Sequence, residues 1–171
     1  MILRIPGDAM VVLVGPSGSG KSTFAARHFA TTQILSSDEL RAIVADDAND
    51  QTATNAAFEL LHTALAMRLA RRKLTVVDAT SVDGWARERL LAVARRLGRP
   101  AAAIVFNLPL ATCLERNAAR ADRRLPSAAI RGQFDRMRGS LDGLAAEGFD
   151  QIAVLSTAGE VDGIVVELLP D

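Results

Sequence analysis

A glycine-rich stretch near the start of the chain has the composition of a phosphate-binding loop. Residues 15–22 read GPSGSGKS, which matches the pattern G-x-x-x-x-G-K-[ST], and they stand between an apolar run and a predicted helix. In this context glycines let backbone N–H groups face phosphates, Lys21 reaches the β- and γ-phosphates, and the Ser22 hydroxyl binds Mg²⁺. We therefore predict an NTP·Mg²⁺ site, with contacts from Gly15, Ser17, Gly18, Ser19, Gly20, Lys21, Ser22 and Thr23.

A carboxylate at the end of a later strand is a candidate second contact to the metal. The run TVVDAT at 75–80 places Asp78 where the strand stops. An acid in this position holds Mg²⁺ in P-loop enzymes. Aspartate also ends strands as a turn or capping residue. The sequence alone leaves a metal role and a purely structural role open for Asp78.

A second polar pair follows another apolar run. The stretch ILSSDELR at 34–41 places Asp38 and Arg41 three positions apart, so that both share one face of a helix. A carboxylate there is suited to orient and deprotonate an attacking hydroxyl. Arg41 would then hold an anion of the acceptor or of the transferred phosphoryl group. The alternative is that Asp38 only caps the helix and that Arg41 is incidental.

Four arginines follow one another at helical spacing in the segment ERNAARADRR at 115–124. On one continuous helix they lie within an arc of about 100°, and no acid stands three or four positions from any of them. We predict a lid over about 115–127 that closes on the phosphates; a solvated charged face is the alternative. If the helix ends near Ala121, only the first two share the arc. The four are Arg116, Arg120, Arg123 and Arg124.

Apolar runs alternate with amphipathic segments along the whole chain. This order predicts an α/β fold with a five-stranded parallel sheet flanked by helices on both faces, in a single domain over 1–171. Ligands of such sheets bind beyond the carboxyl ends of the strands, where Ser22, Asp38 and Asp78 all fall. We expect strands at 10–14, 32–36, 73–79, 101–107 and 151–156, and helices at 22–30, from Asp38, 51–72, 84–97, 110–121, 127–146 and after the last strand.

Composition excludes several classes of protein. Twenty basic and twenty acidic residues cancel, so no overall cationic field attracts duplex nucleic acid or membranes. Aromatic residues make up only 4%, which argues against a fold that stacks bases on aromatic platforms. The single Cys113 excludes an internal disulfide framework. Trp85 and Phe134 could stack on an acceptor base, but packing of each against the core is the favoured interpretation. With no long apolar run or signal peptide, we expect a soluble, cytoplasmic protein without membrane contact.

The order and spacing of these motifs resemble the 5′-OH polynucleotide kinase module of bacterial polynucleotide kinase-phosphatases, which act in RNA end healing and repair. The resemblance rests on VVLVGPSGSGKSTFA, LSSDELR, DDANDQT, LTVVDATSV, IVFNLPL and ERNAARADR, and it covers essentially the whole chain. It implies a fold similar to adenylate kinase with an arginine lid. It also implies ATP or another NTP with Mg²⁺ as donor, and transfer of its γ-phosphate to 5′-OH ends of RNA or DNA, healing them for ligation.

The resemblance assigns roles to individual residues. Lys21 and Ser22 match the donor and metal positions, Asp38 matches the general base, and Arg41 matches the acceptor-side arginine. The phosphate clamp matches Arg116 and Arg123, with Arg120 as a helper. In such proteins, phosphatase and ligase-like modules follow in a longer chain, and they are expected partners here.

Two other functions remain open from the sequence. The first is a small-molecule kinase of the same fold, acting on a sugar, an acid or an antibiotic hydroxyl. The second is an NTP-dependent switch or interaction module without acceptor chemistry, for which Asp38 would be dispensable.

Overall fold

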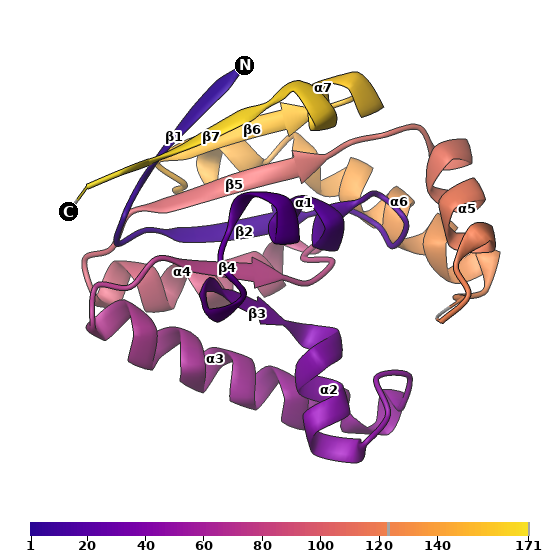
Figure 1. Cartoon of the computed structure of the whole chain (residues 1–171), viewed down its shortest axis with the longest axis horizontal. Helices are drawn as coiled ribbons and strands as arrows, with labels where there is room; N and C mark the ends of the chain where they lie inside the picture. Colours follow the sequence, from indigo (N-terminus) through magenta and orange to yellow (C-terminus); the bar gives the residue numbers. More distant parts are fainter. Residues whose placement is uncertain (123, 171) are drawn as a thin grey trace.

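The order of strands in the main sheet places the phosphate loop at its centre. The computed structural model describes residues 1–122 and 124–170. All neighbouring strands are parallel, so the predicted five-stranded parallel sheet is confirmed. Their carboxyl ends point toward the same end of the molecule (Figure 1). In spatial order the strands are β3 (Ile34–Ser36), β4 (Thr75–Asp78), β2 (Met10–Val14), β5 (Ala101–Phe106) and β6 (Gln151–Leu155).

Helices cover both faces of this sheet, which is why its central strands are apolar throughout. Every residue of β2 and β5 is buried. On one face the core contains side chains of α1 (Lys21–His28) and α7 (Ala158–Gly163). On the other it contains side chains of α3 (Thr54–Ala70), α4 (Gly84–Arg96) and α6 (Ser127–Leu141). Two further helices, α2 (Ser37–Ala45) and α5 (Leu110–Ala119), begin close to the carboxyl ends of the strands.

The apolar stripe of α3 is narrower than its sequence indicates. Leu61, Leu65 and Leu69 are fully buried at helical spacing, together with Ala57. Leu60, which fits the same period loosely, is 41% exposed. Leu60 faces away from the core because one position along a helix turns a side chain by about 100° relative to its neighbour Leu61.

A two-stranded parallel ribbon was not predicted from the sequence. It pairs β1 (Ile2–Pro6) with β7 (Val165–Leu169), and Arg4 and Glu167 are paired across it with a 2.9 Å ion pair. Leu3 and Ile5 point into the core between exposed neighbours. These strands join opposite ends of the chain, and no local pattern shows such a pairing.

Several predicted elements have different bounds. The strand expected at 32–36 is shortened by the 3₁₀ turn Thr31–Gln33, and the helix expected from Gln51 begins as the 3₁₀ turn Gln51–Ala53. The helix expected at 127–146 ends at Leu141, before the 3₁₀ turn Leu144–Ala146. The expected helix 110–121 ends at Ala119, because Arg120 has extended backbone angles. Within the described residues, no helix is long and apolar enough to cross a membrane.

Candidate active site

The loop between β2 and α1 has backbone angles that only glycine adopts readily. Gly18 and Gly20 have φ of 82° and 99°, in the left-handed region. A Cβ on Gly18 would overlap the carbonyl oxygen of Cys113 in α5. The loop therefore packs directly on the backbone of α5, and α1 begins beyond it with its N-terminal N–H groups facing the cleft described below.

Lys21 lies inside the curve of this loop. Its ammonium donates to the carbonyl oxygens of Gly15 at 2.8 Å and Pro16 at 3.0 Å. Burial lowers the pKa of Lys21 to about 8, although Asp78 and Asp38 nearby partly oppose the shift. The lysine is thus a desolvated cation that a polyphosphate would stabilise.

Asp78 and Ser22 form a hydrogen-bonded pair in the site. Asp78 ends β4 in register with Leu13 of β2 and Ser36 of β3. Its carboxylate is hydrogen-bonded to the Ser22 side chain, and burial raises the pKa of Asp78 while Lys21 opposes that shift. The described residues hold no cluster of three or more His, Cys, Asp or Glu suited to a metal. One hydroxyl and one carboxylate are the donors that Mg²⁺ uses when substrate phosphates complete its shell.

Asp38 and Arg41 lie one strand away, on α2. The N-cap of α2 is Ser36, whose hydroxyl accepts from the Glu39 N–H at 3.4 Å, so capping does not account for Asp38. Arg41 is only 5% exposed, and its Nη1 donates to Asp38 Oδ1 at 3.0 Å and to the Ala48 carbonyl at 2.8 Å. Its Nε is buried without a partner in the described part of the chain. Such an orphan donor is costly unless a ligand accepts from it.

The arginine segment differs from its prediction in two ways. Since α5 ends at Ala119, Arg124 lies beyond the helix and no single arc joins the arginines. Arg120 lies 3.6 Å from Asp122, beyond the end of the helix, so the absence of acids at helical spacing does not leave Arg120 without a counterion. The end of the helix brings together residues two apart, which helical spacing would separate. Arg123 lies outside the described residues.

Two arginines of this segment contact backbone, one of them in the phosphate loop. Arg116 Nη1 donates to the Ser19 carbonyl at 3.4 Å and lies next to Gly20. Arg124, in contrast, donates to the carbonyl of Arg120 at 2.6 Å and is exposed. Arg116 is thus the arginine that the fold attaches to the phosphate loop.

Sequence reasoning missed the contribution of α6. Gln133 Oε1 accepts from the Ser17 N–H at 2.8 Å, and Ser17 shares its peptide group with the Pro16 carbonyl that Lys21 contacts. Three residues later on the same helix, Arg136 Nε lies 3.2 Å from Asp83. The only signal in the sequence for this contact was indirect: α6 directly follows the arginine segment.

Residues 79–83, which follow β4, form another wall of the site, and Arg87 holds them in place. The Thr80 carbonyl accepts from the Gly15 N–H at 2.9 Å, which ties this segment to the phosphate loop. Arg87, fully buried, donates to the carbonyls of Ser81 and Val82 at 2.9 Å and is paired with Glu147. This buried ion pair sets the position of residues 79–83.

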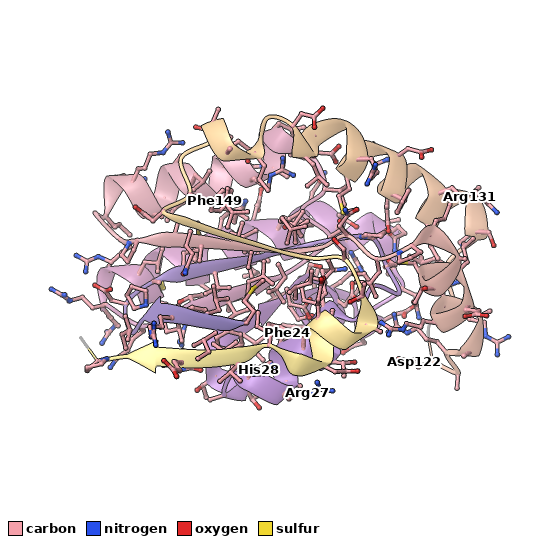
Figure 2. The ribbon with its side chains drawn as sticks, turned by 90° about the horizontal axis from the view of Figure 1, so that it is seen from above. Phe24, Arg27, His28, Asp122, Arg131 and Phe149 are labelled. Atoms are coloured by element: carbon pink, nitrogen blue, oxygen red, sulfur yellow. The ribbon has the colours of Figure 1, made fainter. Side chains whose placement is uncertain are left out.

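These walls enclose one cleft of about 1260 Å³, which is joined to a smaller cavity of about 480 Å³ through shared residues such as Ser22 and Asp38. Arg27 and Asp122, both on its lining, are labelled in Figure 2. Among the described lining residues, seven cations face four carboxylates, a surplus suited to a polyanion. The cations are Lys21, Arg27, Arg41, Arg116, Arg120, Arg124 and Arg136; the acids are Asp38, Asp78, Asp122 and Asp162.

Comparison with known proteins agrees with a kinase-type fold. A family model described as an AAA domain matches residues 10–144. No curated protein matches the sequence significantly.

Several solved structures are similar to this chain. A chain of the Pnkp1/Rnl/Hen1 RNA repair complex has a TM-score of 0.68 and 21% identity, over 81% of this chain and 46% of that one. A gluconokinase from Sinorhizobium meliloti 1021 has a TM-score of 0.58 and 20% identity, over 94% and 89%. A chain of the AvrRxo1-ORF1:-ORF2 complex with ATP has a TM-score of 0.68 and 14% identity, over 91% and 55%. The chain thus spans about half the length of the first and third, and at these identities the likeness shows a P-loop kinase-type fold alone.

Proposed function

We propose that this chain, which belongs to the AAA domain family, is an NTP-dependent kinase that phosphorylates 5′-hydroxyl ends of RNA or DNA. A nucleotide-dependent kinase is the class that the P-loop and the kinase neighbours support. The polynucleotide acceptor is our own inference from the cleft. It agrees with the likeness to a chain of an RNA repair complex, and broken ends healed in this way would be ready for ligation.

The observation that carries the proposal is the pair of Asp38 and Arg41 beside the phosphate loop. A carboxylate near the attacking group suits a kinase whose acceptor is a hydroxyl, because it can orient the hydroxyl and take its proton. A buried arginine with an orphan Nε directly behind that carboxylate is suited to an acceptor that carries its own phosphate. A nucleic acid end has both groups, whereas a neutral sugar has only the hydroxyl.

The proposed reaction uses Asp38, the phosphate loop and the arginine segment. Asp38 accepts the proton of the 5′-hydroxyl while the hydroxyl oxygen bonds to the γ-phosphorus. The bond from that phosphorus to the β–γ bridging oxygen breaks at the same time. Lys21 and the loop N–H groups hold the β- and γ-phosphates, and Arg116 closes on them together with Arg120 and Arg123. The products are a 5′-phosphate end, an NDP and a protonated Asp38.

The metal role is also a proposal. The Ser22 hydroxyl and the Asp78 carboxylate would hold Mg²⁺, Asp78 directly or through water, with phosphate oxygens as the other ligands. Bound Mg²⁺ supplies charge neutralisation at the phosphates. The buried Asp78 would be kept ionised by the ion and by Lys21.

The test is a transfer assay with γ-labelled ATP and Mg²⁺. The acceptors are 5′-OH RNA, 5′-OH DNA, the same strands with 5′-phosphate, and small polyhydroxy acids and sugars. We expect label on the 5′-OH strands only. Label on small acceptors and none on 5′-OH strands would reject the proposal and favour the second candidate.

That second candidate is a small-molecule kinase. It is favoured by the likeness to a gluconokinase, which covers nearly the full length of both chains. The buried cation behind Asp38 would then hold the carboxylate of a small acid. Hydrolysis of ATP with no acceptor labelled, unaffected by Asp38→Asn, would instead indicate a switch or interaction module.

A further inference from the structure

The sequence favoured packing of Trp85 against the core, but in the structure Trp85 does not pack there. It is 67% exposed, whereas Phe134 packs against the core as predicted. Trp85 is the single tryptophan of the chain. A large aromatic ring left in water calls for an explanation when it stands near a ligand site.

Trp85 stands two residues after Asp83, which is paired with a residue of the cleft wall. It lies in the first turn of α4, and Asp83, the N-cap of that helix, lies 3.2 Å from Arg136 Nε. Arg136 and Thr80 both line the cleft. The beginning of α4 is therefore attached to the cleft wall through this ion pair.

The neighbouring helix shows which side of α4 carries this ring. Both α3 and α4 run back from the carboxyl ends of the strands, so they are parallel. The two helices are neighbours, and after burial the charge of Arg89 on α4 lowers the pKa of His62 on α3, which places these residues at similar levels along the pair. Four positions earlier on each helix stand Trp85 and Phe58, one turn nearer the cleft. Phe58 lines the cleft, and Trp85 stands at the corresponding level of the neighbouring helix.

The acceptor side of the cleft is formed by the same region. Asn49, Gln51, Thr54 and Phe58 line it on the side of Asp38 and Arg41. A strand whose end is held at Asp38 would leave past α3, toward Trp85. Arg136, which is paired with the N-cap of α4, is the cation of the lining that the structure ties to the start of that helix.

We propose that Trp85 is a stacking platform for the base of a nucleotide that follows the 5′-terminal one in a single-stranded acceptor, with Arg136 near its phosphate. This inference rests on the proposed function and adds a subsite to it. Aromatic rings bind bases of any sequence in this way, because every base has a π-face. The platform would distinguish an oligonucleotide from a single nucleotide without selecting a sequence.

The fluorescence of this single tryptophan gives a direct measurement. We expect a 5′-OH tetranucleotide to quench it at saturation, and a nucleoside 3′-monophosphate or ATP·Mg²⁺ to leave it nearly unchanged. In transfer assays, Trp85→Ala should raise KM for the tetranucleotide about 10-fold, within the range of one lost stacking contact, with kcat unchanged. KM for the nucleoside 3′-monophosphate should not change, and Trp85→Phe should restore most of the affinity.

Met67→Ala is the matched control, since Met67 is 64% exposed but lies near the far end of α3. If Trp85→Ala leaves KM for the tetranucleotide unchanged while the wild type phosphorylates it, the platform is wrong and the proposed function stands. The exposed ring would then belong to a different surface, such as a protein contact. If the wild type phosphorylates no 5′-OH strand, the proposed function is overturned and the platform with it.

Discussion

At the scale of single residues, the cleft separates a donor side around Lys21 from an acceptor side around Asp38. The two are close enough for Asp38 to affect the pKa of Lys21. Neither residue contributes to the apolar core. Substitutions here should therefore change chemistry before they change the fold.

Asp38→Asn keeps the shape of the carboxylate and its ability to accept a hydrogen bond, but it cannot take the proton. We expect kcat for 5′-OH transfer to fall by at least about 10²-fold, the lower end of general-base contributions, with nearly normal NTP and acceptor binding. The reverse reaction should fall in parallel. Steady-state kinetics and equilibrium binding measure both; a variant within a few-fold of wild type would show that the base lies elsewhere, and loss of NTP binding would move Asp38 to the metal site.

The stability of the protein should depend on pH through Lys21, and the burial of Lys21 fixes the sign of that dependence. Its pKa is about 8 in the folded protein, against 10.5 as the ordinary value. Between these values the unfolded chain binds a proton that the folded chain does not, so the stability of the nucleotide-free protein rises with pH in this window. We expect the Tm difference between wild type and Lys21→Met to shift in favour of wild type from pH 8 to 10. Parallel Tm curves would contradict this.

NTP binding should follow the opposite trend. The phosphates need the ammonium form, so affinity should weaken as pH rises well above 8, and Lys21→Ala should abolish transfer while leaving the fold intact. Near-wild-type transfer by Lys21→Ala would show that the loop is not the donor site.

At the scale of elements, three segments that are distant in sequence hold the phosphate loop: α5 below Gly18, α6 through Gln133, and residues 79–83 through Thr80. Arg116 lies on the first of these segments, and Arg120 and Arg124 follow its end. Their effects should therefore depend on which contact each makes, and not on their number.

Arg116→Ala should lower kcat strongly, about 10²-fold or more, because Arg116 is attached to the loop at Ser19 and would follow the phosphates. Arg124→Ala should have little effect, since its side chain bonds to the carbonyl of Arg120. Arg131, which projects outward from α6 in Figure 2, offers a neutral control as Arg131→Ala. Equal losses in all three variants would indicate diffuse electrostatics in place of a clamp.

Arg87 supports the third segment. Arg87→Met would leave Glu147 without its partner and the Ser81 carbonyl without its Arg87 donor, while Val82 keeps the Ser140 hydroxyl, so we expect a loss of about 3 kcal/mol in the free energy of unfolding. Urea denaturation measures it. The double variant Arg87→Met/Glu147→Leu should recover part of the loss, and a double variant less stable than the single one would contradict the role of the pair.

At the scale of the whole molecule, equal numbers of basic and acidic residues leave no long-range field, and the surplus of cations is confined to the cleft. Acceptor binding should thus weaken with salt along a shallow slope. For about two to three neutralised phosphates, the log–log slope is roughly −2 for single strands. Fluorescence titrations at several salt concentrations measure it, and a slope several times steeper would indicate an extended nucleic-acid track.

Much of the fold could be predicted because its signals are local. The phosphate loop is a contiguous pattern, the five strands of the main sheet are apolar runs, and parallel strands bring their carboxyl ends to one edge. Asp38 and Asp78 reach that edge for this reason alone. The ribbon of β1 and β7 was missed because it pairs residues from opposite ends of the chain.

What the sequence by itself determined is the position of each polar residue along its own element. Only the tertiary structure decided which of them meet. Gln133 reaches Ser17 across 116 residues, Arg120 meets Asp122 because α5 ends early, and Trp85 faces solvent where the sequence favoured packing against the core. Local patterns depend on the period of a helix or strand, whereas these contacts depend on how elements distant in sequence pack against one another.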